Sequence, residues 1–337
     1  MRISDRKRAA LISSNPKSAI PNPQWIVGID EAGYGPNLGP LVQAAVAIRL
    51  PAADPAGWET LKPIVRSAAG RWGRDARLVI DDSKRVYHGP NALGKLELGV
   101  LACASQHHTT LGPLLHHFCS PCANADLRAE SWFDSAHSLP IESCPEQLAR
   151  QRQSLAGFSA ATFGAIFARV VPAPRFNDAV ARTGSKATVL SEGLIELVQQ
   201  SFDAAAGEEP LRIVCDKQGG RAVYGPMLQE AFPEGFVICE AERPDESRYR
   251  LECLGRPVSV LFRPRADGDS VAVALASMVC KYLREVCMLQ FNAYWATHVP
   301  GLVATAGYPL DAKRFFADIR PALAKLGVKD ETIWRVK

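Results

Sequence analysis

The chain has 337 residues, of which 47% are hydrophobic, so it is long enough to bury a substantial core. Its formal net charge is +4, which permits a polyanionic partner without requiring one. No apolar run reaches the roughly 18 residues that a membrane-spanning helix needs, so the sequence predicts a protein without a membrane span.

The first segment, residues 1–24, is polar, with basic residues near its start and prolines further on. Its apolar stretch is too short for the core of a signal peptide. We expect a flexible basic tail that is solvated rather than bound to a phosphate backbone, followed by a catalytic domain over residues 25–337. The nine cysteines are odd in number, and without an export signal they predict reduced thiols in a cytoplasmic protein.

Apolar runs separated by turn residues predict the elements that follow. A hairpin is expected first, with strands over 25–29 and 41–50 and a turn-rich stretch from Gly33 to Pro40 between them. Residues from about 88 to 157 show no clear pattern. Further strands are expected over 78–80, 160–171, 211–215, 236–239 and 258–262, and helices over 186–202, 270–291 and 311–326. Strands mixed with helices indicate an α/β fold with helices packed on a sheet, but the strand order cannot be read from the pattern.

Carboxylates follow three of the apolar segments. Asp30 and Glu31 end the first strand, Asp216 ends the strand over 211–215, and Asp267 lies just before the long apolar helix. Carboxylates gathered at strand ends would repel one another and raise each other's pKa. A divalent cation relieves that repulsion, and hard oxygen ligands suit Mg²⁺ or Mn²⁺. Two such ions roughly 4 Å apart would serve phosphodiester hydrolysis.

The pattern also has simpler interpretations. Adjacent strand residues point to opposite faces, so Asp30 and Glu31 can share a site only if the strand ends or twists there. Gly33 and Gly35 could supply such a break. Any one acid alone could be a surface charge or a helix cap, and both Asp267 and Asp269 could cap the helix at Ser270.

Five motifs, taken in order, resemble those of type 2 ribonuclease H. They are Gly28-Ile29-Asp30-Glu31-Ala32-Gly33-Tyr34-Gly35-Pro36 with Gly39-Pro40-Leu41-Val42, then Asp82-Ser83-Lys84, Ile213-Val214-Cys215-Asp216, Arg265-Ala266-Asp267 with Ala276-Ser277-Met278-Val279-Cys280-Lys281, and Gly307-Tyr308-Pro309. The resemblance implies a ribonuclease H-like mixed β-sheet flanked by helices, interrupted by an insertion at about 88–157.

The resemblance also implies a function. It predicts an endonuclease that cleaves the RNA strand of RNA–DNA hybrids, or duplex DNA next to embedded ribonucleotides. By position, the catalytic and metal-binding residues are Asp30, Glu31, Asp216 and Asp267. The substrate-binding residues are Gly33, Tyr34, Gly35, Ser83, Lys84, Lys281 and Tyr308. Lys84 matches a lysine that contacts phosphate, and Tyr308 matches a tyrosine that packs on a sugar.

The chain departs from that family in two motifs. The family has Gly-Arg-Gly where this chain has Gly33-Tyr34-Gly35, so a guanidinium is lost and Tyr34 could stack or donate one hydrogen bond instead. The histidine expected after the Gly-Tyr motif is replaced by the region of Lys313 and Arg314. Two alternatives therefore stay open: a nuclease of the same fold that cuts another structured nucleic acid, and a non-catalytic nucleic-acid-binding protein.

The proposed insertion carries part of a zinc-binding pattern. Cys119 and Cys122 have the spacing of half a site, with His116, His117 and Cys103 nearby. A second half is missing unless Cys144 joins from a distance. A loop with incidental histidines and cysteines is the favoured interpretation.

Overall fold

The computed structural model describes residues 22–69, 75–205 and 207–336. The predicted basic tail lies outside the described residues up to residue 21. Its last residues begin the first strand, β1 (Pro23–Ala32). No described helix is long and apolar enough to cross a membrane, including the 28-residue α10 (Val271–His298).

The described residues form one seven-stranded mixed sheet in the order β5-β2-β1-β6-β9-β8-β7. Its other strands are β2 (Leu41–Pro51), β5 (Thr162–Val171), β6 (Leu211–Asp216), β7 (Phe236–Glu242), β8 (Ser247–Glu252) and β9 (Val258–Arg263). The predicted hairpin is present, since β1 pairs antiparallel with β2. On its other edge β1 runs parallel to β6, which runs parallel to β9. The prediction of an α/β fold with a mixed sheet flanked by helices is confirmed.

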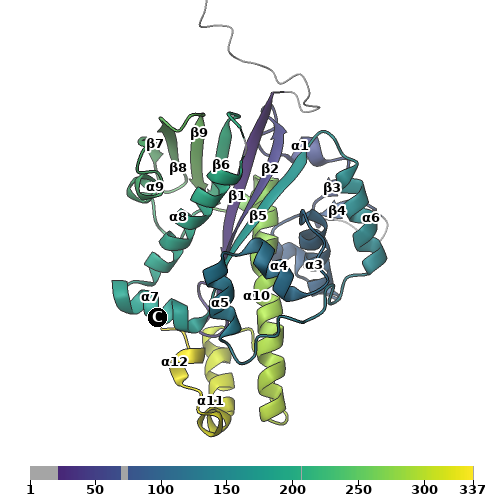
Figure 1. Cartoon of the computed structure of the whole chain (residues 1–337), viewed down its shortest axis with the longest axis vertical. Helices are drawn as coiled ribbons and strands as arrows, with labels where there is room; N and C mark the ends of the chain where they lie inside the picture. The colour runs from purple at the N-terminus through teal and green to yellow at the C-terminus, as the bar shows by residue number, and fades with distance from the viewer. Residues whose placement is uncertain (1–21, 70–74, 206, 337) are drawn as a thin grey trace, which may run out of the picture.

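Helices cover both faces of this sheet (Figure 1). On one face, α10 packs against β1 and β2 and joins their apolar side chains to those of α3 (Ala92–Cys103). On the other face, α8 (Lys186–Ala204) and α9 (Gly225–Ala231) cover side chains of β1, β6 and β9. Beyond the sheet, α10 continues and packs on α11 (Pro309–Leu326). The remaining helices are α1 (Trp58–Leu61), α2 (Ser83–Val86), α4 (Leu111–Phe118), α5 (Pro121–Arg128), α6 (Pro145–Ala156), α7 (Ala173–Thr183), α12 (Asp330–Ile333) and the 3₁₀ turn η2 (Ala266–Gly268).

The first half of α10 is apolar on every side because it lies inside the protein. Every residue from Val271 to Cys280 is buried. The helix reaches the sheet at Gly28, where the absence of a side chain lets the backbone of β1 touch that of α10. This contact fixes the helix that follows Asp267 against the strand that carries Asp30.

Two parts of the sequence fold differently from the simplest expectation. The predicted strand at 78–80 is β4 (Leu78–Val79), which pairs only with β3 (Val65–Arg66) in a separate two-stranded sheet. The segment from about 88 to 157 is largely helical, and leucines of α3, α4 and α6 join the same core as α10. The limits of this segment as an insertion stay a prediction.

Candidate active site

Two of the four predicted acids meet because their strands are parallel neighbours. Ile29 of β1 stands beside Cys215 of β6, so Asp30 and Asp216 emerge next to each other at the same edge of the sheet. In the parallel register of β6 and β9, Asp216 lies beside Arg263, the last residue of β9. The turn after β9 carries Asp267 in η2, and the backbone N–H of Ala266 donates to Asp216 Oδ1 at 3.2 Å.

Asp30 and Glu31 are adjacent residues of a continuous strand, the arrangement that was expected to separate their side chains. The strand continues through Ala32, so Asp30 and Glu31 point to opposite faces. Asp30 faces α10, where the Ser277 hydroxyl hydrogen-bonds to its carboxylate. Glu31 lies on the α8 and α9 face, where its charge acts on Tyr34 and Tyr224. Asp30 and Asp216 therefore share one face, and Glu31 reaches the same edge from the other.

Burial and mutual repulsion control the charge of the four acids. Desolvation, together with the charges of Asp216 and Asp267, raises the pKa of Asp30 from 3.8 to about 7. Desolvation, followed by the charges of Asp30 and Asp216, raises the pKa of Glu31 from 4.5 to about 8. These mutual effects show that the carboxylates share one electrostatic environment.

The pKa values of the other two acids are also raised, chiefly by burial. Three backbone N–H groups partly offset this effect at Asp216, and the charge of Lys84 lowers the pKa of both Asp216 and Asp267. Asp267 does not cap α10: its Oδ1 accepts the Gly268 N–H at 3.0 Å, and Asp269 pairs with Arg263 at 3.2 Å. In the described parts of the chain, no three His, Cys, Asp or Glu side chains are arranged to hold a metal ion.

The Asp-Ser-Lys motif lies beside this cluster. Asp82 begins α2 and accepts the Lys84 N–H at 2.9 Å, so the motif forms the first turn of a helix. The buried Ser83 hydroxyl is hydrogen-bonded to Ser277 Oγ at 3.0 Å, which places it one residue away from Asp30. Lys84 is exposed, and its ammonium acts on Asp216 and Asp267.

Lys281 is engaged within the protein. Its ammonium forms a 2.6 Å ion pair with Glu285 and stands 4.5 Å from the ring centre of Tyr87, whose hydroxyl also donates to Glu285. The predicted binding of substrate by Lys281 would therefore have to compete with this pair.

The loop from Gly33 to Pro40 is held by two buried arginines that the motifs did not single out. Gly33 has φ +87°, which ends β1 and turns the chain. Arg284 of α10 donates to the carbonyls of Pro40 at 2.6 Å and Leu38 at 3.3 Å. Arg335, only 1% exposed, donates to the carbonyls of Gly33 at 2.6 Å and of Pro36.

Arg284 lies three residues after Lys281 in the same apolar helix, so a charged residue within a buried helix was a usable signal. Arg335 follows the short helix α12 and shows no pattern in the sequence that points to the loop. Its guanidinium lies 4.9 Å from the ring centre of Phe176. Burial, and then the charge of Arg284, lowers its pKa to about 9.

The late Gly-Tyr motif is attached to the same loop. The Gly307 carbonyl accepts the N–H groups of Asn37 at 2.8 Å and Leu38 at 3.3 Å. Tyr308, 56% exposed, is the residue before α11. The two segments that the resemblance assigns to nucleotide recognition are therefore joined through their backbones.

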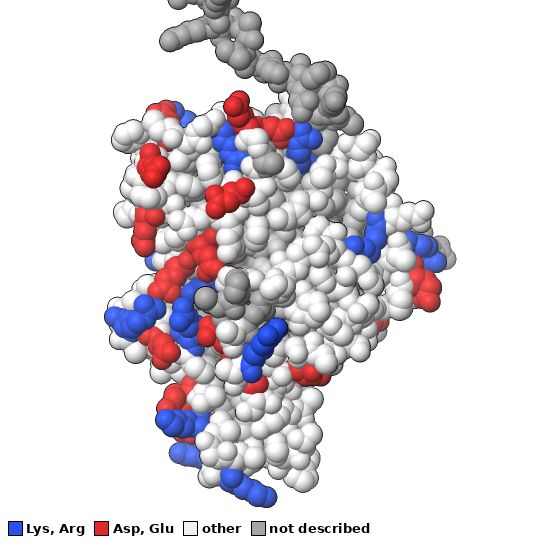
Figure 2. All heavy atoms as spheres, viewed as in Figure 1, with Lys and Arg blue, Asp and Glu red and all other residues white. Residues whose placement is uncertain are grey.

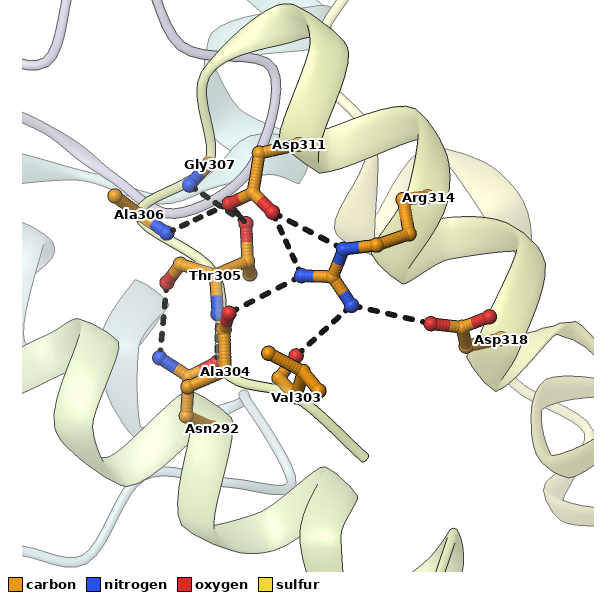
Figure 3. Close-up of polar contacts among 9 residues, drawn as sticks. All are labelled: Asn292, Val303, Ala304, Thr305, Ala306, Gly307, Asp311, Arg314 and Asp318. Atoms are coloured by element: carbon orange, nitrogen blue, oxygen red, sulfur yellow. Dashed lines mark hydrogen bonds and ion pairs between the residues drawn. The ribbon is translucent and has the colours of Figure 1, made fainter. Parts of the chain in front are cut away.

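A network of hydrogen bonds and ion pairs fixes the segment that precedes Tyr308 (Figure 3). Asp311 accepts the Thr305 hydroxyl at 2.5 Å and the Ala306 N–H at 3.1 Å, and it pairs with Arg314 at 2.6 Å. Arg314 also donates to the carbonyls of Val303 and Ala304 and to Asp318. The arginine near the position of the family's histidine thus holds the segment 303–307.

The histidines and cysteines of the proposed insertion are distributed among different contacts. His117 is hydrogen-bonded to His108 at 2.9 Å, and Cys144 donates to Glu146 at 2.8 Å. Cys103 and Cys119 are buried, and burial raises the pKa of both thiols. The side chain of Cys122 lies outside the described parts.

Figure 2 shows how charged side chains are distributed over one face of the molecule, where a nucleic acid would need a basic surface. Over the described residues of this face, acidic and basic side chains are interspersed on the left, and most of the right is uncharged. This face therefore presents no continuous basic track.

Comparisons with known proteins give remote structural likenesses only. No protein-family model and no curated protein matches the chain. Among solved structures, it is similar to RNase HII from Archaeoglobus fulgidus, solved in complex with PCNA, with 15% identity, 93% of this chain and 94% of that chain covered, and a TM-score of 0.41. It is also similar to ribonuclease H2 from Pyrococcus horikoshii, with 12% identity, 92% of each chain covered and a TM-score of 0.43. A third similar structure is Bst-RNase HIII in complex with Mn²⁺, with 14% identity, 94% of this chain and 67% of that chain covered, and a TM-score of 0.42. Likenesses at these scores define neither a family nor an activity.

Proposed function

We propose that this protein is a metal-dependent endonuclease of the ribonuclease H type, acting on RNA–DNA hybrids or on duplex DNA with embedded ribonucleotides. The observation that carries the proposal is the meeting of Asp30, Glu31, Asp216 and Asp267 at one edge of the sheet. Burial raises the pKa of each, and repulsion from other carboxylates raises it further for Asp30, Glu31 and Asp267. Buried acids that repel one another are costly to a fold unless a cation binds them.

The donor set fits divalent cations. Carboxylate oxygens suit Mg²⁺ or Mn²⁺, and all four acids would take part in holding the ions. Bound ions would supply activation of water and stabilisation of the leaving oxygen. Because no three described side chains are arranged to hold an ion, we expect binding to require rotation of some of these carboxylates.

The surrounding residues supply orientation and charge. Ser277 fixes the carboxylate of Asp30, and the backbone N–H of Ala266 fixes that of Asp216. Lys84 places an exposed positive charge beside Asp216 and Asp267, where a phosphate group would approach the acids. Its exposure leaves the ammonium accessible to a substrate.

Ribonucleotide recognition is assigned to the joined segments. Gly35 has no side chain to keep a ribose away from the backbone, and no heavy atom lies within 4 Å of the position that its Cβ would take. At Gly33 that position is taken by the Pro40 carbonyl oxygen and the Arg284 side chain. Tyr308 offers an exposed aromatic ring on the linked segment for packing against a sugar.

The proposal is tested by cleavage. A labelled RNA–DNA hybrid, a duplex with one embedded ribonucleotide and an all-DNA branched duplex would each be incubated with Mg²⁺ or Mn²⁺. We expect cuts at ribonucleotides, abolished by Asp216→Asn while duplex binding survives. The matched control is Asp269→Asn, which removes a neighbouring carboxylate that pairs with Arg263.

The same assay separates the alternatives. Cleavage of the branched duplex alone would favour a nuclease for another structured nucleic acid, which the tyrosine at position 34 leaves open. Duplex binding without any cleavage, together with no Mn²⁺ binding by calorimetry, would favour a non-catalytic nucleic-acid-binding protein.

A further inference from the structure

Tyr34 is the residue at which this chain loses the arginine of the resembled motif, and two cations surround it. Lys186, the first residue of α8, places its ammonium 4.7 Å from the centre of the Tyr34 ring. Arg221, in the segment between β6 and α9, is close enough for its charge to lower the pKa of Tyr34. The two cations come from different elements and meet the loop on the face of the sheet that carries Glu31.

Neighbouring basic residues are neutralised, but these two are not. Arg169 pairs with Glu192 and Glu196 of α8, and Arg182 pairs with Glu192. Within the described ranges, neither Lys186 nor Arg221 has a carboxylate within ion-pair distance. Two positive charges without acidic partners therefore stand beside the Gly33–Gly35 turn.

Arg221 is oriented by contacts that leave part of its guanidinium available. Its Nη1 donates to Ser191 Oγ of α8 at 2.8 Å, and the group lies 5.7 Å from the ring centre of Tyr224. Tyr224 is itself fixed by stacking on Phe262, with ring centres 3.7 Å apart. A guanidinium held by one nitrogen keeps further N–H donors for an anion.

Tyr34 contributes a neutral donor and a ring. Burial, and then the charge of Glu31, raises the pKa of its hydroxyl, so the phenol stays protonated at neutral pH. The ring holds Lys186 by a cation–π contact, which orients the ammonium and removes some of its water. A protonated phenol and two cations are the groups that bind a phosphodiester.

We propose that Lys186, Arg221 and Tyr34 form a subsite for one backbone phosphate of the substrate strand, supplying the positive charge that the loop lacks. This inference rests on the proposed function, because the anion is taken to be the nucleic-acid backbone. The subsite lies on the Glu31 face, opposite Lys84. The Lys186–Arg221 pair and Lys84 would therefore bind the substrate strand on either side of the acids.

The test compares the single variants Lys186→Ala and Arg221→Ala and their double variant with the wild type. Each should raise KM for the hybrid about five- to tenfold with kcat within about twofold, and should reduce the slope of log(kcat/KM) against log salt by about one. Arg182→Ala is the matched control, since it removes an equal charge that is already paired with Glu192. It should leave KM and the salt slope unchanged.

Two further measurements identify the ligand as one phosphate. Replacing single linkages by neutral methylphosphonates should reveal one position that weakens the wild type but no longer weakens the double variant. Tyr34→Arg in the Lys186→Ala background should restore KM. Unchanged KM and salt slope in the double variant, or no position with this non-additive effect, would overturn the subsite.

The outcome is separable from that of the proposed function. If the wild type cuts none of the duplexes, the nuclease proposal fails, and fluorescence anisotropy of a labelled hybrid at several salt concentrations still tests the subsite. Equal affinities and salt slopes for wild type and double variant would then reject it. Complete absence of hybrid binding by the wild type would reject both proposals.

Discussion

Gly28 of β1 lies directly against Ala272 of α10, so that a Cβ added to Gly28 would stand 2.1 Å from the carbonyl carbon of Ala272. No movement of a flexible side chain can relieve such an overlap, because the obstructing atoms belong to the helix backbone. The contact sets the distance between the strand that carries Asp30 and the helix that follows Asp267.

We therefore expect Gly28→Ala to lower the free energy of unfolding by about 3 kcal/mol, since strand and helix must separate. Urea unfolding measures the loss. Gly35→Ala is the control, because no heavy atom lies within 4 Å of its added Cβ, and it should change stability by less than about 0.5 kcal/mol. Equal stabilities of the two variants would contradict the close packing.

The pKa values of the acids predict how stability depends on pH without metal. Asp30 and Glu31 have pKa values raised to about 7 and about 8, so between about pH 4 and pH 8 the folded protein binds more protons than the unfolded chain. Stability in EDTA should therefore fall as the pH rises through this window. Asp30→Asn should flatten the decline, since it removes one acid and its repulsion of Glu31.

Thermal unfolding between pH 5 and pH 9 measures this effect, with Asp269→Asn as a control that keeps the wild-type slope. Mn²⁺ should raise Tm most at the alkaline end, where the acids are charged and bind the ion best. Parallel curves for wild type and Asp30→Asn would show that the carboxylates do not repel one another as described.

Asp267 and Asp269 offer a comparison within one turn. Asp267 acts electrostatically on Asp30, whereas Asp269 pairs with Arg263 at the surface. We expect Asp267→Asn to reduce kcat by about a hundredfold or more, and Asp269→Asn by less than about threefold. Single-turnover cleavage at saturating metal distinguishes the two, and similar losses for both would place the catalytic cluster elsewhere.

We expect replacement of Arg335 to loosen the loop over 33–36 while leaving the overall stability of the protein nearly unchanged. Arg335→Met removes a buried charge whose Nε and Nη1 find no hydrogen-bond partner among the described residues, so Tm should change little. It also removes the contacts to the carbonyls of Gly33 and Pro36, so amide hydrogen exchange over 33–36 should become faster. Exposed Arg320→Met should alter neither quantity, and unchanged exchange in Arg335→Met would show that the loop does not depend on it.

The network before Tyr308 predicts unequal effects of two neighbouring aspartates. Asp311→Asn weakens the contacts to Thr305, Ala306 and Arg314, and should cost about 1–2 kcal/mol of stability (Figure 3). Asp318 pairs only with Arg314 in the contacts described, at the surface, so Asp318→Asn should cost less than about 0.5 kcal/mol. Chemical denaturation measures both, and equal losses would contradict the inner position of Asp311.

The central strands were predictable because burial on both faces gives β1, β2 and β6 continuous apolar runs. The strand β8 was missed although its residues alternate strictly between buried and exposed, which is the period-2 signal of a half-exposed strand. Strand order could not be predicted, because pairing between β1 and β6 joins residues almost two hundred positions apart and leaves no local pattern.

The candidate site was predictable at its acids and less so around them. Motif order identified Asp30, Asp216 and Asp267, and the structure brings them to one edge, although their roles stay a prediction. The opposite orientation of Glu31 follows from β1 continuing to Ala32, which the glycines at 33 and 35 did not reveal. Lys186 and Arg335 lie far from every motif in the sequence, and only the folded chain shows their proximity to the loop.

The contact between Arg335 and Gly33 spans 302 positions, whereas the β1–β2 hairpin that contains Gly33 needs only its own neighbours. During synthesis the hairpin can pair from local contacts, but the contacts of Arg335 to the turn form only after residue 335 has been made. The segment assigned to reading the ribose is thus made 302 residues before the arginine that binds its Gly33 carbonyl. A growing chain would therefore carry Asp30 and Glu31 long before Arg335 could hold the loop that follows them.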